Sequence, residues 1–259
     1  AAEGRRRGEQ PELEELPPLP PEAAARLDRL LEAFPQAYGS YEEPWEVRNE
    51  EFLSLFKPRR CSSTYGELDQ SHFARLVVSA RLGPGDALVD AGSGLGKLVA
   101  VAAALTSVGT AWGVELSPTR HALALEAADR LLELGALDAA EHGRMRLLEG
   151  DCLDGLPEEA LQATHFAVTM KRSHDAVKRL RNALRGRPLP SGRSRVIWSV
   201  GFTLARCGGL RYSRRLQVKG FYRPPQAGPR SLDVAEEPDG FVVHEYVLEP
   251  RPWLAIDGC

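Results

Sequence analysis

The residues best suited to chemistry lie in the stretch VDAGSGLGK, in which an apolar run ends at Asp90. Glycines follow at alternate positions, Gly92, Gly94 and Gly96, with Ser93 between the first two. A strand that turns through such a glycine loop into a helix leaves backbone N–H groups and the helix N-terminus at its carboxyl end. Because side chains are absent, a ligand can approach the backbone closely. The stretch therefore predicts a site for a nucleoside-bearing ligand.

The spacing of the glycines differs from two common nucleotide-binding loops. The dinucleotide fingerprint G-x-G-x-x-G requires a glycine at position 97, where the chain has Lys97. The phosphate-binding loop requires G-K-[ST], and the sequence contains no such tripeptide. The pattern therefore argues against a nicotinamide, flavin or phosphate-loop protein.

Two more acids follow short apolar runs further along the chain. Glu115 ends the run TAWGVE, 19 residues after Gly96, and Asp151 follows the run MRLLEG. In dinucleotide sites an acid at the position of Glu115 accepts both ribose hydroxyls, and Asp151 is placed to accept the exocyclic amine of adenine. A single acid at a strand end is usually only solvated. Three of them, Asp90 included, beside one glycine loop predict a nucleoside site.

The elements that must position these residues alternate between strand and helix. Short apolar runs predict strands at 87–90, 110–115, 145–150, 165–170 and 195–200. Amphipathic stretches predict helices between them, near 96–107, 117–134, 156–161 and 173–185. Two β-like stretches without a helix between them, 214–222 and 240–249, predict an antiparallel hairpin at the sheet edge. The predicted fold class is therefore α/β, with a doubly wound, mostly parallel sheet.

The first 64 residues have a different character. Residues 1–21 carry dense charge and closely spaced prolines, which predicts an extended arm or linker without a core. Helical spacing of apolar residues in 22–34 and 44–56 predicts an N-terminal helical region over 22–64. A third helix, at about 68–82, opens the main domain, which we expect to span 65–259.

Length and composition fit a soluble protein with a sizeable core, since 43% of the 259 residues are hydrophobic. No stretch is apolar enough to span a membrane, and no signal peptide opens the sequence. The four cysteines form no C-x-x-C pair, which argues against zinc and for reduced thiols in an intracellular protein. The sequence starts at Ala1, so either a leader has been removed or the numbering begins inside a longer product. The choice between nucleus and organelle stays open.

Charge is unevenly distributed along the chain. Between Lys171 and Arg230 there are 16 Lys and Arg residues and one acid, Asp175, whereas the whole chain has a net charge of −3. This basic window predicts a surface that contacts nucleic acid or an acidic partner. The other interpretation is an ordinary solvated face, balanced by the acidic remainder of the chain.

The motifs VDAGSGLGK, GVE and EGD resemble the first motifs of class I S-adenosylmethionine-dependent methyltransferases. The resemblance implies a Rossmann-like sheet of seven strands, whose strands six and seven agree with the predicted edge hairpin. It also implies S-adenosylmethionine as the cofactor, bound by Asp90, the glycine loop, Glu115 and Asp151.

Upstream, residues 63–68 read STYGEL and are similar to the non-SET histone lysine methyltransferases, the disruptor-of-telomeric-silencing family. In that family the Y-G-E loop covers the cofactor and helps to line the lysine channel. The resemblance therefore implies these roles, at the catalytic site, for Tyr65 and Glu67. The segment also fits a helix N-terminus with a capping box of Thr64 and Glu67. The two interpretations are compatible.

One segment departs from that family. After its fourth strand the family has an asparagine that frames the methyl-transfer site, whereas residues 169–172 of this chain read TMKR. The N-P-P-Y motif of amino-methylating nucleic-acid enzymes and the Pro-Cys nucleophile of cytosine-5 enzymes are also missing there. The residual candidates for acid–base chemistry are His72, His174 and Tyr212.

Two hypotheses of function remain. The first is an active protein-lysine methyltransferase that uses S-adenosylmethionine, which the intact glycine loop and acids favour. The second is a catalytically inactive methyltransferase-like scaffold, a subunit of a larger nucleoprotein or organellar assembly, which the missing asparagine favours. The sequence leaves the methyl acceptor and the oligomeric state open.

Overall fold

The computed structural model describes residues 11–39, 47–59, 63, 65–152, 155–168, 174–187, 189, 193–200, 204, 210–218, 220–223 and 241–248. For residues 65, 174–179, 220–223 and 241 it describes the backbone only. The sequence predictions for residues 1–10, for Thr64, for the TMKR segment and for residues 224–230 lie outside this part of the chain.

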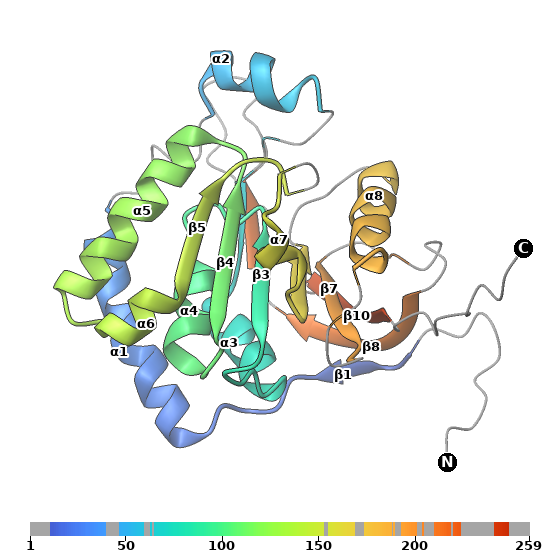
Figure 1. The fold of residues 1–259 in the computed structure, drawn as a ribbon. Coiled ribbons are helices and arrows are strands. Elements are labelled where there is room, and N and C mark those ends of the chain that lie inside the picture. Colours follow the sequence, from blue (N-terminus) through green and yellow to red (C-terminus); the bar gives the residue numbers. More distant parts are fainter. Residues whose placement is uncertain are drawn as a thin grey trace, which may run out of the picture.

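The core of the fold is one mixed sheet of eight strands in the order β1-β8-β10-β7-β6-β3-β4-β5 (Figure 1). These strands are β1 (Leu13–Glu15), β3 (Ala87–Ala91), β4 (Thr110–Glu115), β5 (Met145–Glu149), β6 (His165–Val168), β7 (Arg195–Val200), β8 (Leu210–Val218) and β10 (Phe241–Leu248). A second sheet contains β2 (Tyr65–Leu68) and β9 (Gly220–Arg223). In the large sheet β10 runs antiparallel to β7 and β8, and the other pairs are parallel. The predicted α/β fold with a mostly parallel sheet is confirmed, and β1 is added to the seven strands expected.

Helices cover both faces of the large sheet (Figure 1). They are α1 (Pro21–Tyr38), α2 (Asn49–Glu51), the π-helical turn η2 (Phe52–Phe56), α3 (Gln70–Ser79), α4 (Lys97–Leu105), α5 (Pro118–Glu133), α6 (Ala139–Arg144), α7 (Glu158–Leu161) and α8 (His174–Arg185). Apolar side chains of α1, α3, α4 and α5 share one buried cluster, and α7 and α8 contribute to another. With helices on both sides, the central strands are buried on both faces, which is why they appear in the sequence as continuous apolar runs.

The proline-rich arm contributes to the sheet. Its strand β1 pairs in parallel with β8, with Leu13 opposite Arg215. Leu16, directly after β1, is buried in the same apolar cluster as α1 and α4. This part of the arm therefore has a place in the core that its composition did not indicate.

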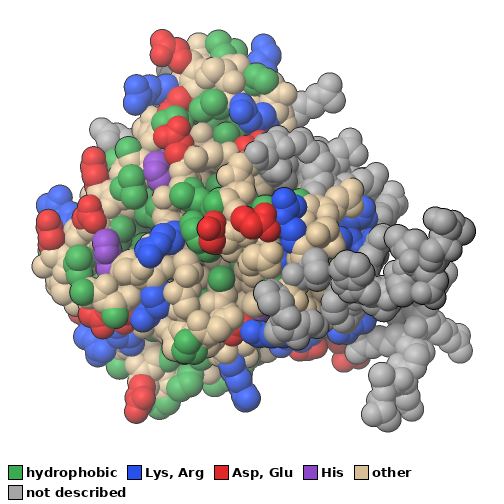
Figure 2. All heavy atoms as spheres, in the orientation of Figure 1, with side chains coloured by type: hydrophobic (Ala, Val, Ile, Leu, Met, Phe, Trp, Pro, Cys, Tyr) green, Lys and Arg blue, Asp and Glu red, His purple; other side chains and the backbone are tan. Residues whose placement is uncertain are grey.

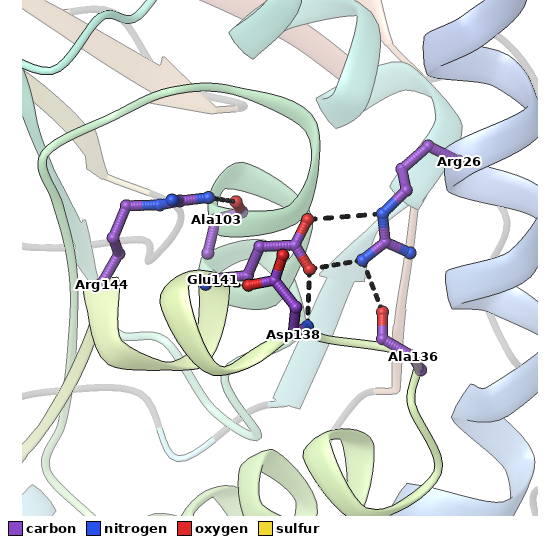
Figure 3. Close-up of polar contacts among 6 residues, drawn as sticks. All are labelled: Arg26, Ala103, Ala136, Asp138, Glu141 and Arg144. Atoms are coloured by element: carbon purple, nitrogen blue, oxygen red, sulfur yellow. Dashed lines mark hydrogen bonds and ion pairs between the residues drawn. The ribbon is translucent and has the colours of Figure 1, made fainter.

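Helix α1 is fastened to the main domain on its apolar and polar sides. Leu27, Leu30 and Phe34 are buried, at the helical spacing from which the helix was expected. On the polar side, Arg26 Nη2 donates to Glu141 Oε2 at 2.5 Å (Figure 3). Glu141 also closes the capping box of α6 (Figure 3). The N-terminal helical region thus packs directly onto the sheet domain.

The STYGEL segment is where local structure differs most from the expectation. Its last four residues form β2, which pairs antiparallel with β9. Helix α3 follows, capped by Asp69, whose side chain accepts the His72 N–H. The capping box proposed for Glu67 is therefore wrong, because the helix begins at Gln70 and not in the Y-G-E segment. Of the helix expected at 44–56, residues 49–56 are present as α2 and η2 and residues 47 and 48 are not helical, while residues 44–46 lie outside the described part of the chain.

Candidate functional site

The glycine loop joins the carboxyl end of β3 to the first turn of α4. Its glycines have positive φ angles, 91° at Gly92, 54° at Gly94 and 77° at Gly96. Gly96 is the left-handed N-cap of α4, a conformation that a Cβ would strain. The N–H groups of Gly92 and Ser93 donate to the Val114 carbonyl at 2.8 and 3.1 Å, which folds the loop towards β4. The predicted strand, loop and helix are all present.

Glu115 lies beside this loop, at the carboxyl end of β4. Its side chain is buried, its Oε2 accepts the Gly94 N–H at 2.9 Å, and its Oε1 accepts the Ser117 N–H at 2.9 Å. Each carboxylate oxygen keeps a lone pair for a further donor. Two backbone N–H groups therefore orient the acid for which we predict contact with ribose hydroxyls.

Gly113 is a site residue that the sequence pattern did not single out. A Cβ at this position would lie 2.8 Å from Leu147 Cδ2 and 2.9 Å from both Ser93 Oγ and Val99 Cγ2. Only glycine lets β4 pack this closely against the loop. The available signal was a glycine inside a predicted strand, which often marks a close approach of backbone.

The other two predicted acids lie at the same edge of the sheet. Asp90 is buried near the end of β3, and Asp151 is buried just after β5. Arg59 Nε lies 3.3 Å from Asp151 Oδ2. The structure thus brings Asp90, the glycine loop and Glu115 together, with Asp151 two strands away from β3 and next to Arg59.

Glu51 fastens a further segment to this edge, where Figure 1 shows α2 above the ends of the strands. Its carboxylate accepts from Thr119 Oγ1 at 2.6 Å, from the Thr119 N–H at 3.1 Å and from Ser117 Oγ at 3.2 Å. Burial would raise the pKa of Glu51, but these hydrogen bonds and the charge of Arg48 together outweigh it and lower the pKa. The charged carboxylate thus ties α2 to the start of α5. The sequence carried no signal for this contact.

Glu67 of the STYGEL segment meets the first residue of α4. Lys97 Nζ lies 2.8 Å from Glu67 Oε1 and 2.9 Å from its Oε2, and the two side chains are 4% and 9% exposed. The segment therefore lies against the start of α4, beside Gly96. For Tyr65 the described backbone pairs with Arg223, and the role of its side chain stays a prediction.

The residual acid–base candidates are not brought together. His72 Nδ1 lies 2.9 Å from Asp69 Oδ1 at the start of α3. The Tyr212 hydroxyl shares a hydrogen bond with Nδ1 of His244 on β10, a residue that the sequence pattern did not suggest. Burial raises the pKa of Tyr212 and lowers that of His244. His174, the third candidate, is described by its backbone at the start of α8.

Several arginines of the basic window have acceptors within the chain. Arg195 is buried and donates to three backbone carbonyls, and burial lowers its pKa to about 10. The ion pairs that involve the window include Arg187–Glu158, Arg193–Asp86 and Arg214–Glu245. Figure 2 shows basic and acidic side chains interspersed over one face. The charge of the window is thus partly balanced inside the chain, and its contact with a polyanion stays a prediction.

The described residues contain no group of three or more His, Cys, Asp or Glu side chains that could hold a metal ion. Within the same part of the chain, no helix is long and apolar enough to cross a membrane. The groups that the described residues gather at the carboxyl edge include backbone N–H groups, carboxylates, the cations of Lys97 and Arg59, and the hydroxyls of Ser117 and Thr119.

The strand order and the glycine loop together define the fold. A parallel set β7-β6-β3-β4-β5, a glycine loop after β3 and an antiparallel β10 between β7 and β8 form the Rossmann-like fold of class I S-adenosylmethionine-dependent methyltransferases. The family model described as "Histone methylation protein DOT1" matches residues 47–165. In that part, which contains β2, the glycine loop, Glu115 and Asp151, the chain resembles the non-SET histone lysine methyltransferases, as its motifs predicted.

Individual relatives match shorter parts of the chain or match less closely. "Histone-lysine N-methyltransferase, H3 lysine-79 specific" of Caenorhabditis elegans is 31% identical over 93 residues, which are 36% of this chain and 10% of that protein. The structure of precorrin-6y C5,15-methyltransferase from Geobacter metallireducens is 16% identical, with a TM-score of 0.47 over 73% of this chain and 93% of that one. TrmN from Thermus thermophilus is also 16% identical, with a TM-score of 0.44 over 68% and 48% of the two chains. The family match over residues 47–165 gives no support to the hypothesis of an inactive scaffold.

Proposed function

We propose that the chain binds S-adenosylmethionine at the glycine loop and transfers its methyl group to a lysine side chain of a protein. The observation that carries the proposal is the contact between Glu115 and the Gly94 N–H, 2.9 Å long. It holds a buried carboxylate at the rim of a glycine loop, with lone pairs left for the two hydroxyls of a ribose. Asp151, after the next strand, is then the acceptor for the amine of adenine.

The proposed reaction asks for positioning more than for strong acid–base groups. The cofactor supplies an electrophilic methyl group on a sulfonium, so the chain must hold an amine in line with it and let that amine lose a proton. The segment that carries Tyr65 and Glu67 supports this role because it lies against the first turn of α4. The TMKR segment, which lacks the asparagine of the family, lies outside the described residues.

A protein lysine is the acceptor that the family match favours. The matched part, residues 47–165, includes the Y-G-E segment together with the cofactor motifs. A basic surface would suit an acceptor presented on a nucleoprotein, and Arg181 and Arg185 of α8 are the candidates for phosphate contacts. The proposal therefore includes an intracellular location, nuclear or organellar, where a protein acceptor bound to nucleic acid would be found.

The test is methylation of defined acceptors with radiolabelled S-adenosylmethionine. Histone octamers, nucleosomes and free DNA serve as acceptors, and mass spectrometry identifies the modified atom. We expect label on lysine, reduced at least about tenfold by Glu67→Gln because the ion pair that holds this segment is lost. Glu126→Gln, at an exposed position of α5, is the matched control.

Three outcomes would count against parts of the proposal. Label on DNA or on arginine would refute the lysine acceptor but keep the methyltransferase. Binding of S-adenosylhomocysteine without transfer to any of these acceptors would favour the scaffold hypothesis. Absence of S-adenosylhomocysteine binding would refute the site itself.

A further inference from the structure

Lys97 stands at a position that disfavours a lysine. It is the first residue of α4, directly after the N-cap Gly96, and is 3% exposed. The helix macrodipole places partial positive charge at this end, and burial penalises a charged amine. A buried cation here therefore needs compensation from elsewhere in the chain.

The compensation comes from two segments that are distant in sequence. The Glu67 carboxylate of β2 contacts Lys97 Nζ through both oxygens, at 2.8 and 2.9 Å. Gln70 Nε2 donates to the same carboxylate at 3.4 Å. The ring of Tyr38, at the end of α1, has its centroid 5.1 Å from Nζ, within the range of a cation–π contact. The end of α1, β2 and the start of α4 thus meet at one ammonium group.

We infer that Lys97 is a positioning residue that holds β2, and with it Tyr65 and Glu67, against the glycine loop before any ligand binds. Strand β2 pairs with β9 in a two-stranded sheet, an arrangement that is only marginally stable without further packing. A buried ion pair contributes little net stability, but it can select one arrangement of the groups that it joins. The inference rests on the proposed function, which gives this segment its role in methyl transfer.

The contacts of Lys97 should control the position of β2 and not the cofactor edge around Glu115. Glu115 is oriented by backbone N–H groups of Gly94 and Ser117, and neither contact involves Lys97. Loss of the Lys97 charge should therefore release β2 while the cofactor edge stays formed. The KM for the protein acceptor should rise at least about tenfold, whereas the Kd for S-adenosylhomocysteine should change by less than about threefold.

Amide hydrogen exchange tests the inference without any ligand. In Lys97→Met the amides of residues 65–68 should exchange at least about tenfold faster than in the wild type, while those of β4 stay unchanged. Lys97→Arg should restore slow exchange, since it keeps the charge. Lys57→Met, at an exposed lysine that follows η2, is the control and should match the wild type.

A double variant shows whether the ion pair between Lys97 and Glu67 is what slows amide exchange in β2. Glu67→Gln should accelerate the same amides, and Lys97→Met combined with Glu67→Gln should add little to either single change. If Lys97→Met fails to fold, Glu67→Gln alone decides by the same comparison. Unchanged exchange in β2, equal acceleration in β4, or fully additive effects would each overturn the inference. Failure of the wild type to bind S-adenosylhomocysteine would refute the proposed function, while the exchange result would still decide the role of Lys97.

Discussion

The two halves of the large sheet each bury a glutamate, but the two glutamates have different hydrogen-bond donors. In the half made of β3, β4 and β5, Glu115 lies at a strand end and is oriented by backbone N–H groups. In the half made of β7, β10 and β8, Glu245 lies within β10 and accepts from Arg214 Nη2 at 2.6 Å and from Trp198 Nε1 at 3.1 Å. The first arrangement leaves lone pairs at the edge of the sheet, and the second uses them inside the fold. One half is therefore suited to a ligand, and the other is tied together by side chains.

The largest effect should come from filling the space between β4 and the glycine loop. Gly113→Val should destabilise the fold by about 3 kcal/mol or more, because even its Cβ would overlap three side chains. Chemical denaturation measures the loss. Gly143→Ala is the matched control, since a Cβ there meets nothing within 4 Å and alanine is the better helix former. A loss in Gly143→Ala as large as in Gly113→Val would mean that any glycine replacement is harmful and that close packing at the loop is not the cause.

The second largest effect is expected in the half made of β7, β10 and β8, from loss of the Arg214–Glu245 pair. Arg214→Ala should cost about 2 to 3 kcal/mol of unfolding free energy, because Glu245 would stay buried without its cation. Burial raises the pKa of Glu245, yet Arg214 and the other donors lower it overall, so the carboxylate is charged in the wild type. Arg187→Ala removes an exposed ion pair and should change stability little. Equal stability of the two variants would mean that the buried Arg214–Glu245 pair contributes no more than the exposed Arg187–Glu158 pair.

A pH effect is expected from His165, on β6 where the two halves meet. Burial lowers its pKa to about 4, so the folded protein keeps this imidazole neutral below the usual pKa of histidine. The stability linked to it is complete above about pH 6.5 and is lost as the pH falls towards 4, by at most about 3 kcal/mol. His165→Gln should flatten the stability profile in that window. Parallel profiles of the wild type and His165→Gln would contradict the assignment.

Sequence reasoning succeeded where the pattern is local. The strands between residues 87 and 200 were placed to within two residues, because their apolar runs and the glycine loop are continuous in the chain. It failed where partners are distant: Lys97 and Glu67 are 30 residues apart, and Arg214 and Glu245 are 31 apart. The stretch expected as one strand at 214–222 is divided between β8 and β9, which belong to different sheets. Such pairing depends on the tertiary fold, so no local pattern reports it.

The most direct test of the account is calorimetry of S-adenosylhomocysteine with the wild type, Glu115→Ala and Glu149→Ala. Glu149 is the register partner of Glu115 on β5, but it is exposed, which makes it a matched control. We expect Glu115→Ala to lose about 1.5 to 3 kcal/mol of binding free energy, roughly 10- to 150-fold in Kd, because a charged hydrogen-bond acceptor is removed. Glu149→Ala should bind like the wild type. Equal affinities for the wild type and Glu115→Ala, or no binding by the wild type, would contradict the assignment of the glycine loop and Glu115 as the cofactor site.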